Sequence, residues 1–168
     1  PLGDGIILRY PGYLDKILEV ALLESVPALA RPPGLRDGLA LTGFVRVLPG
    51  VLWGDLFSEL DKKGHYVPPY PASYKFASLG GGVANNCGGE KTVKYGSVRE
   101  WVIAIKAVLA DGSEVEFRKL NPEELAQKQA QKDLEGEIYR QTADLLIASH
   151  NLIQNSRLKV NKSSTGYW

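Results

Sequence analysis

The residues best suited to chemistry lie in a glycine-rich run over 78–89, Ser-Leu-Gly-Gly-Gly-Val-Ala-Asn-Asn-Cys-Gly-Gly. Glycine allows positive φ at little cost and lets a ligand approach the main chain, because no Cβ atom is in the way. Successive amide N–H groups that point inward bind anions, and the carboxamides of Asn85 and Asn86 add further donors. The run therefore predicts a loop that holds a phosphate or pyrophosphate group. The alternative, in which the glycines only turn the chain, stays open.

Two common phosphate-binding motifs do not fit this run. The nucleoside-triphosphate loop needs a Lys followed by Ser or Thr directly after its last glycine, whereas Glu90 follows Gly89 and no helical period begins there. The dinucleotide fingerprint needs the spacing G-x-G-x-x-G between a strand and a helix, and that spacing is absent. A different fold must therefore hold the predicted ligand.

Few other side chains suggest chemistry. His65 and His150 have no second ligand at metal-binding spacing, so the sequence predicts no metal site and favours ordinary structural roles for both. No serine has the flanking glycines of a nucleophile elbow, so catalytic residues stay unassigned. Lys91, Lys94 and Arg99 border the glycine run, where they suit phosphate screening and a solvated surface equally well.

The composition is that of an ordinary globular chain. Its 168 residues carry 20 Lys plus Arg and 19 Asp plus Glu, a formal net charge of +1, which argues against nucleic-acid binding through a basic face. Hydrophobic residues make up 44%, enough for the core of one conventional domain. The one cysteine, Cys87, cannot form an internal disulfide, and no apolar run approaches the roughly 20 residues that span a bilayer. Since the N-terminus also lacks a signal-peptide pattern, a soluble cytoplasmic protein is expected.

Hydrophobic spacing predicts the elements that precede the run. Near the N-terminus, apolar residues recur at helical spacing and predict a short amphipathic helix that includes Leu14, Ile17, Leu18, Ala21 and Leu22. A loop is expected over 26–43, followed by a strand over 44–48 that ends at a Pro-Gly turn. The apolar residues of 53–60 then predict a helix that ends at Lys62-Lys63-Gly64.

The second half of the chain gives clearer local signals. Residues 65–100 show no sustained period, and because they include several aromatics they predict a binding loop rather than disorder. The run 101–109 predicts a strand, Asp111-Gly112 a hairpin turn and 114–118 the returning strand. Asn121 is expected to cap a helix that begins at Pro122, with Glu124 completing the cap. This helix is polar up to about residue 132, and an apolar face returns after Gly136.

Further motifs lie on both sides of the glycine run, in one fixed order. They are Pro49-Gly50-Val51, Gly54-Asp55-Leu56, Pro68-Pro69, Pro71-Ala72-Ser73, Leu79-Gly80-Gly81, Ala84-Asn85-Asn86, Gly88-Gly89, Lys94-Tyr95-Gly96 and Val108-Leu109-Ala110-Asp111-Gly112. This series resembles the flavin-binding domain of FAD-linked oxidases. Within that superfamily it is most similar to the glycolate oxidase and D-lactate dehydrogenase branch of the 2-hydroxy-acid oxidoreductases. The resemblance is close over 49–118 and loose over 10–48.

The resemblance implies an α+β fold, a PCMH/VAO-type domain of two small α+β subdomains, with FAD between them and its pyrophosphate on main-chain amides. It implies an FAD-binding domain over 1–120 and a helical extension over 121–168 that leads toward a cap domain absent from this sequence. The cofactor-binding residues that it assigns are Arg31 in a first phosphate loop, Pro71, Ala72 and Ser73 near the flavin, Leu79, Gly80, Gly81, Ala84, Asn85, Asn86 and Gly88 in the pyrophosphate and ribityl loop, and Tyr95 and Gly96 in a closing segment.

The chain also departs from the family pattern. Tyr70 stands where the family usually has Asp, and Gly82 where it usually has Asn. The family's first phosphate loop, an Arg followed by three glycines and a threonine, is missing near 31–43, because Pro32-Pro33-Gly34 follows Arg31. Either the protein has lost half of its grip on the cofactor, or residues of the natural protein are missing from this sequence. The second explanation is favoured, because the flanking segments keep family character on both sides.

The function implied by the resemblance is oxidation of a 2-hydroxy acid, of the D-lactate or glycolate type, by hydride transfer to FAD. In the resembling proteins the catalytic base and the arginine that binds the substrate carboxylate belong to the cap domain. Some flavoproteins bond the flavin to a cysteine, but a packed thiol is favoured for Cys87. Two alternatives stay open: a degenerate FAD-fold scaffold without flavin activity, and a flavin reductase of cell-wall precursor synthesis. The sequence identifies no electron acceptor.

Overall fold

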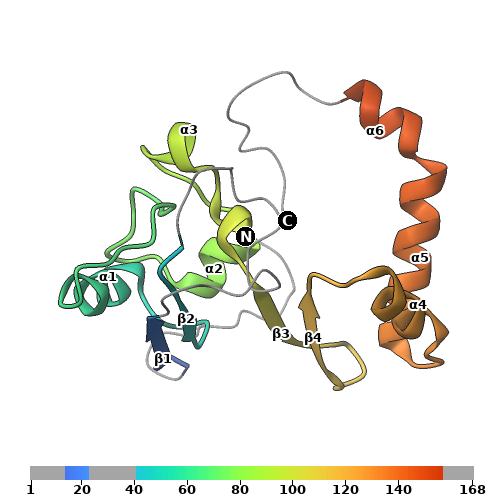
Figure 1. Ribbon diagram of the computed structural model, residues 1–168, viewed down its shortest axis with the longest axis horizontal. Helices are drawn as coiled ribbons and strands as arrows, with labels where there is room; N and C mark the ends of the chain where they lie inside the picture. The colour runs from blue at the N-terminus through green and yellow to red at the C-terminus, as the bar shows by residue number, and fades with distance from the viewer. Residues whose placement is uncertain (1–13, 23–40, 157–168) are drawn as a thin grey trace, which may run out of the picture. The chain divides into compact units, whose positions relative to one another are not determined.

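The computed structural model describes residues 14–22 and 41–156. The chain divides into two compact units, the first running to Trp101 and the second beginning at Val102. Each unit combines helices with one two-stranded antiparallel sheet (Figure 1). The predicted α+β fold class is therefore confirmed.

The first unit contains two strands and four short helices among its described residues. They are β1 (Ile17–Leu22), β2 (Gly43–Val47), α1 (Trp53–Asp61), α2 (Leu79–Ala84), α3 (Thr92–Tyr95) and the 3₁₀ helix η2 (Val98–Trp101). The strand predicted over 44–48 is confirmed as β2, within one residue at each end.

Strand β1 occupies the segment that was predicted to be a helix, so that prediction is wrong. Ile17 pairs with Val47 and Val20 with Val45 in an antiparallel register. The pairing with β2, which is distant in sequence, satisfies the backbone polar groups that a helix would satisfy locally. Leu14, Leu18 and Leu22, which produced the helical spacing, are 41%, 53% and 48% exposed and form no buried helix face.

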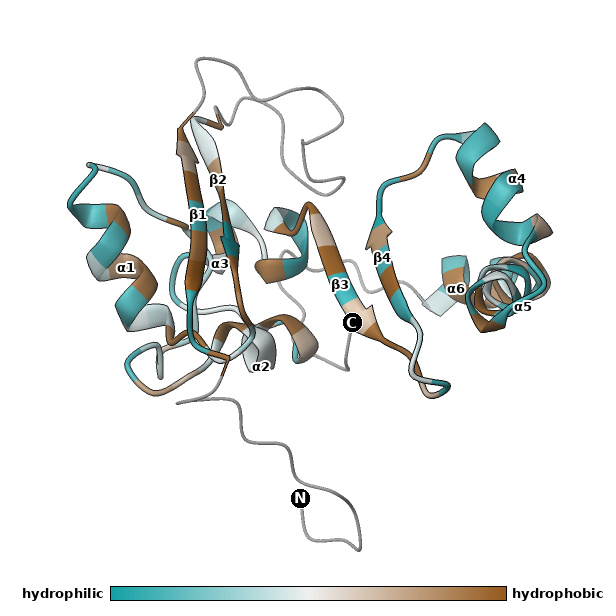
Figure 2. Cartoon of the chain, turned by 90° about the horizontal axis from the view of Figure 1, so that it is seen from below, coloured by the Kyte–Doolittle hydropathy of each residue, from teal (hydrophilic) through white to brown (hydrophobic). Residues whose placement is uncertain are grey.

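Helix α1, predicted over 53–60, forms part of the core of the first unit. Its residues Trp53, Leu56 and Leu60 are between 0% and 3% exposed, and Val51 just before it is 1% exposed. These apolar side chains recur at helical spacing, and Figure 2 shows the apolar and polar residues of α1 on different sides of the helix. Gly64, at φ 71°, ends the turn that follows α1.

The segment expected to be a loop contains regular structure. Residues 79–84 form α2, capped by Ser78, whose side chain accepts a hydrogen bond from the Gly81 N–H. Glycine is a poor helix former, but Leu79 and Gly82 are buried, so tertiary packing compensates for the low propensity. The prediction of one irregular loop over 65–100 is therefore wrong for the residues in α2, α3 and η2.

The second unit begins with the predicted hairpin. Strand β3 (Ala104–Val108) pairs with β4 (Glu114–Arg118), which has the predicted bounds, while β3 begins three residues later than predicted. In the turn, the Asp111 carboxylate accepts hydrogen bonds from the N–H and hydroxyl of Ser113. These bonds lower the pKa of Asp111.

Among the described residues, three helices follow the hairpin. Helix α4 (Pro122–Ala130) starts with the predicted capping box, in which Asn121 and Glu124 each bond to the other's backbone N–H. Helices α5 (Leu134–Ala148) and α6 (His150–Ser156) carry the apolar residues expected after Gly136. Several of these residues are exposed: Leu145, Leu146, Ile147, Leu152 and Ile153.

Candidate cofactor site

A pocket of about 230 Å³ lies in the first unit beside α2. Its lining combines one wall from the segment before α2 with a second wall from α2 and the residues after it. The lining residues are Pro71, Ser73, Ala77, Ser78, Gly81, Gly82, Asn85 and Cys87.

The predicted cofactor residues are only partly brought together here. Those that line the pocket are Pro71, Ser73, Gly81 and Asn85. Those that lie outside its lining are Ala72, Leu79, Gly80, Ala84, Asn86, Gly88, Tyr95 and Gly96, and Arg31 lies outside the described residues. Ala77, Ser78, Gly82 and Cys87 were not predicted, although all but Ala77 belong to the glycine-rich run that the sequence singled out.

The backbone amides of the run are used within the chain. The Leu79 N–H donates to the Val51 carbonyl at 2.8 Å, and the Gly80 N–H donates to the Pro49 carbonyl at 2.8 Å. Further along, the Cys87 N–H donates to the Gly82 carbonyl at 2.8 Å. The expectation of a concavity of inward-pointing free amides is therefore wrong for these residues, because the carbonyls of Val51, Pro49 and Gly82 accept their hydrogen bonds.

Most of the glycines allow close packing of the chain on itself. A Cβ atom on Gly80 would lie 2.6 Å from the Cβ atom of Pro49, and one on Gly89 would collide with the carbonyl oxygen of Tyr70. Gly81 differs, since a Cβ atom there would meet only the Ser78 hydroxyl, at 3.2 Å. Gly81 is therefore the predicted glycine that presents main chain to the pocket.

The two asparagines shape the chain after α2. Asn86 has φ 45°, the left-handed conformation that asparagine tolerates better than most residues. Its Oδ1 atom accepts a hydrogen bond from the Arg99 N–H at 3.3 Å. The Asn85 Nδ2 atom donates to the Gly81 carbonyl at 3.0 Å. Both carboxamides thus hold the loop in place, and Asn85 also lines the pocket.

Tyr95 and Gly96, the predicted closing segment, form a turn away from the pocket lining. Gly96 has φ 78° and is in close contact with the Glu100 carboxylate. The Tyr95 carbonyl accepts a hydrogen bond from Trp101 Nε1 at 2.8 Å. The hydrogen bond with the Tyr66 hydroxyl, together with the nearby Lys94, lowers the pKa of Tyr95.

The pocket lies in a segment that matches a known protein family. Residues 36–118 match the family model described as FAD binding domain, and this span includes the whole pocket. Residues 36–118 belong to the FAD binding domain family. The cofactor of this FAD-binding domain is FAD.

Curated relatives support the same family. The chain is 41% identical over 112 residues to glycolate oxidase subunit GlcD of Bacillus subtilis, an alignment that covers 67% of the chain and 20% of the relative. It is 44% identical over 73 residues to D-lactate dehydrogenase of Anaerostipes hadrus, covering 44% and 15% of the two chains. It is 25% identical over 166 residues to D-2-hydroxyglutarate dehydrogenase of Pseudomonas putida, covering 99% and 15%. These alignments thus span a fifth or less of each relative, and no solved structure gave a significant match.

The pocket of the FAD-binding domain fits part of the cofactor. Pockets for drug-sized ligands occupy about 300–1,000 Å³, so a pocket of about 230 Å³ can enclose only a portion of a flavin dinucleotide. The Ser73 hydroxyl lines the pocket and has no hydrogen-bond partner among the described residues, which leaves it available to a polar atom of a ligand. Ser73, Gly81 and Asn85 thus belong both to the pocket lining and to the cofactor-binding residues expected from the sequence.

Cys87 lines the same pocket as a half-buried thiol. Burial raises the pKa of this thiol to about 11. The thiolate is the nucleophilic form of cysteine, so Cys87 is a neutral, weakly reactive group near pH 7. This state fits the packed thiol favoured from the sequence.

The described residues include no cluster of three His, Cys, Asp or Glu side chains that could hold a metal ion. His65 Nδ1 instead lies 3.2 Å from the Thr42 hydroxyl, at hydrogen-bond distance, which connects the end of α1 with the start of β2. Within residues 14–22 and 41–156, no helix is long and apolar enough to cross a membrane.

Proposed function

We propose that this chain is the FAD-binding part of an oxidoreductase that oxidises a 2-hydroxy acid. The observation that carries the proposal is the family match over 36–118, which contains the pocket with Ser73 and Gly81 on its walls. The relatives are named for glycolate, D-lactate and D-2-hydroxyglutarate, which share a hydroxyl group next to a carboxylate. A 2-hydroxy acid is therefore the substrate class that we propose for the whole protein.

The contribution of this chain to the chemistry is to bind and shield the cofactor. When bound, FAD would supply the acceptor for a hydride from the carbon that carries the substrate hydroxyl. Ser73 and Asn85 supply polar groups to the pocket, and the neutral Cys87 thiol and Pro71 supply apolar contact. We assign the catalytic base and the carboxylate-binding group to a cap domain outside these 168 residues. We also keep 1–120 as the FAD-binding domain and 121–168 as the extension toward that cap.

A second candidate is a scaffold domain that keeps the fold and has lost the flavin. Two observations favour it: the amides of Leu79 and Gly80 are bonded within the chain, and Pro32-Pro33-Gly34 follows Arg31 in place of three glycines. Under this hypothesis the pocket stays too small and too poor in donors to hold a dinucleotide.

An FAD titration separates the two candidates. The full-length protein should be yellow as purified, or should quench flavin fluorescence when FAD is added to the apoprotein. Anaerobic addition of D-lactate or glycolate should then bleach the flavin absorbance, whereas bleaching by NADPH alone would indicate a flavin reductase. A colourless protein that binds no FAD would leave only the scaffold.

We further propose that the protein resides in the cytoplasm. Cys87 is the one cysteine of the chain and is a free thiol, which is typical of reducing compartments. Fractionation of cells that express the tagged natural protein tests this location directly.

A further inference from the structure

The two walls of the pocket are each held by backbone hydrogen bonds to other parts of the first unit. The first wall, residues 71–77, is attached to α1, because the Trp53 N–H donates to the Ala77 carbonyl at 3.1 Å and the Gly54 N–H donates to the Tyr74 carbonyl at 3.0 Å. The second wall, residues 81–87, is attached to η2, because the Val98 N–H donates to the Cys87 carbonyl at 3.0 Å. These bonds attach each wall to the rest of the unit, but they do not connect the two walls to each other.

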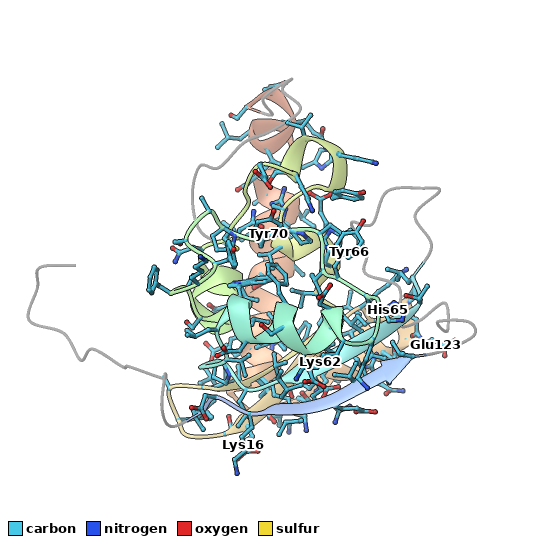
Figure 3. All side chains as sticks on the ribbon, turned by 90° about the vertical axis from the view of Figure 1, so that its left-hand side faces the viewer. Lys16, Lys62, His65, Tyr66, Tyr70 and Glu123 are labelled. Carbon is cyan, nitrogen blue, oxygen red and sulfur yellow. The ribbon has the colours of Figure 1, made fainter. Side chains whose placement is uncertain are left out.

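Side chains join the two segments just beyond the pocket. The Tyr70 hydroxyl donates to Glu90 Oε1 at 2.6 Å, and the Tyr66 and Tyr95 hydroxyls lie 3.2 Å apart. Lys91 Nζ lies 5.3 Å from the ring centre of Tyr66 and 5.5 Å from that of Tyr70. Figure 3 labels Tyr66 and Tyr70, whose side chains lie near each other. We call Tyr66, Tyr70, Glu90, Lys91 and Tyr95 the tyrosine clasp.

Within the clasp, the hydrogen bond between Tyr70 and Glu90 joins residues that lie close in sequence to the two pocket walls. Tyr70 directly precedes Pro71 of the first wall, and Glu90 follows Cys87 of the second wall by three residues. A hydrogen bond to a carboxylate is roughly twice as strong as one between neutral groups. The same bond raises the pKa of Tyr70, so the hydroxyl stays protonated and continues to donate.

The main chains of the two segments are in contact at Tyr70 and Gly89. Gly89 lies against the Tyr70 carbonyl so closely that a Cβ atom would collide with it. The Tyr70 ring is fixed on its other side by edge contacts with Phe57 and Tyr74, at centroid distances of 5.1 and 5.7 Å. Tyr70 therefore has little freedom to move while its hydroxyl is bonded to Glu90.

From this arrangement we propose that Tyr70 and Glu90 are positioning residues for FAD, whose hydrogen bond holds the two pocket walls at the separation that the cofactor requires. The inference rests on the proposed function, since it assigns a role within the same site. Neither residue lines the pocket, so both act through the walls rather than by contact with FAD. Loss of the bond allows the walls to separate, and the expected consequence is faster dissociation of FAD.

The test compares two variants with two matched controls in the full-length protein. Tyr70→Phe removes the hydroxyl and keeps the ring, and Glu90→Gln keeps the shape and removes the charge. Tyr139→Phe removes the hydroxyl of a tyrosine in the second unit, one that packs on Phe117 and has no hydrogen-bond partner among the described residues. Glu59→Gln removes a carboxylate that pairs with Lys62 on α1. FAD affinity and dissociation rate are measured by flavin fluorescence, and wall mobility by amide exchange over 71–77 in the cofactor-free protein.

We expect Tyr70→Phe and Glu90→Gln each to weaken FAD binding about three- to tenfold, and the double variant to bind as the weaker single variant does. Both controls should stay within about twofold of the wild type. Amide exchange over 71–77 should be faster in both variants. If Tyr70→Phe does not fold, the exposed Glu90 still allows the comparison with Glu59→Gln.

Unchanged FAD affinity in both variants, or losses that multiply in the double variant, would overturn the assignment. Lower stability toward urea with unaltered FAD affinity would show a purely structural role and would overturn it equally. These results leave the proposed function intact, because the wild type still binds FAD. A wild-type protein that binds no FAD overturns both.

Discussion

A Cβ atom added to Gly82 would lie 2.7 Å from Nε1 of Trp53 and 3.0 Å from Sγ of Cys87. The Trp53 indole N–H is buried and has no hydrogen-bond partner among the described residues. Position 82, where the resembling family usually has Asn, therefore combines a wall of the pocket with close packing against the core residue Trp53. A side chain at this position would have to displace Trp53 or shift α2.

Gly82→Ala should destabilise the protein by about 1–3 kcal/mol, because the added methyl group overpacks a core that cannot yield easily. Urea unfolding of the full-length protein measures the change. Gly54→Ala is the matched control, since its Cβ atom would meet only ordinary contacts, the nearest at 3.6 Å. Residue 54 lies within α1, and alanine has a higher helix propensity than glycine. Gly54→Ala should therefore be neutral or slightly stabilising. Equal effects at the two positions would contradict the close packing at Gly82.

Replacement of Asn86 separates its backbone role from its side-chain role. Asn86→Ala loses the hydrogen bond from the Arg99 N–H and puts alanine at φ 45°, whereas Asn86→Gly loses only the bond. Because the left-handed conformation costs a residue with a Cβ atom about 1–2 kcal/mol, the alanine variant should be the less stable by about 1 kcal/mol. Thermal or urea unfolding of the pair tests this order, and an alanine variant as stable as the glycine variant would refute it.

The Cys87 thiol should react slowly with alkylating agents at neutral pH. Its folded pKa of about 11 lies above the ordinary value of 9.0, so the alkylation rate should keep rising toward pH 11. The raised pKa also means that the contribution of the thiol to stability is complete below pH 9.0 and is lost as the pH rises toward about 11. Mass spectrometry measures the alkylation rate. Comparison of the pH dependence of unfolding in the wild type and in Cys87→Ala shows how much of the stability change comes from the thiol. A rate that levels off near pH 9 would contradict the burial.

The cap at Asn121 predicts a local stability effect in the second unit. Asn121→Ala removes the side-chain oxygen that accepts from the Glu124 N–H at 2.8 Å, and the expected loss is about 0.5–2 kcal/mol. Gln127→Ala, at an exposed position within α4, is the control and should change stability by less than about 0.5 kcal/mol. Urea unfolding followed by circular dichroism measures both variants.

Local signals were sufficient wherever the deciding contacts are close in sequence. The capping box of Asn121 and Glu124 and the Asp111-Gly112 turn were predicted correctly, because their hydrogen bonds span three residues or fewer. Helix α1 was predicted from the spacing of Trp53, Leu56 and Leu60, since a single buried stripe determines its face. The series of family motifs likewise needed only residue types in a fixed order.

Local sequence patterns did not predict the elements that depend on contacts between residues distant in sequence. Ile17–Leu22 has the spacing of a helix and forms a strand, because its partner Gly43–Val47 lies more than twenty residues away. Leu79–Ala84 contains three glycines and forms a helix, because Ser78 caps it and Leu79 and Gly82 are buried.

By itself, the sequence determined the family of the domain, its cofactor FAD and part of the segment that contains the pocket, namely the run 78–89 together with Pro71 and Ser73. Only the tertiary structure decided which atoms of that segment face the pocket and which are used within the chain. The physical reason is that each backbone amide must find a partner: for Leu79 and Gly80 the partners are carbonyls of Val51 and Pro49, roughly thirty residues earlier.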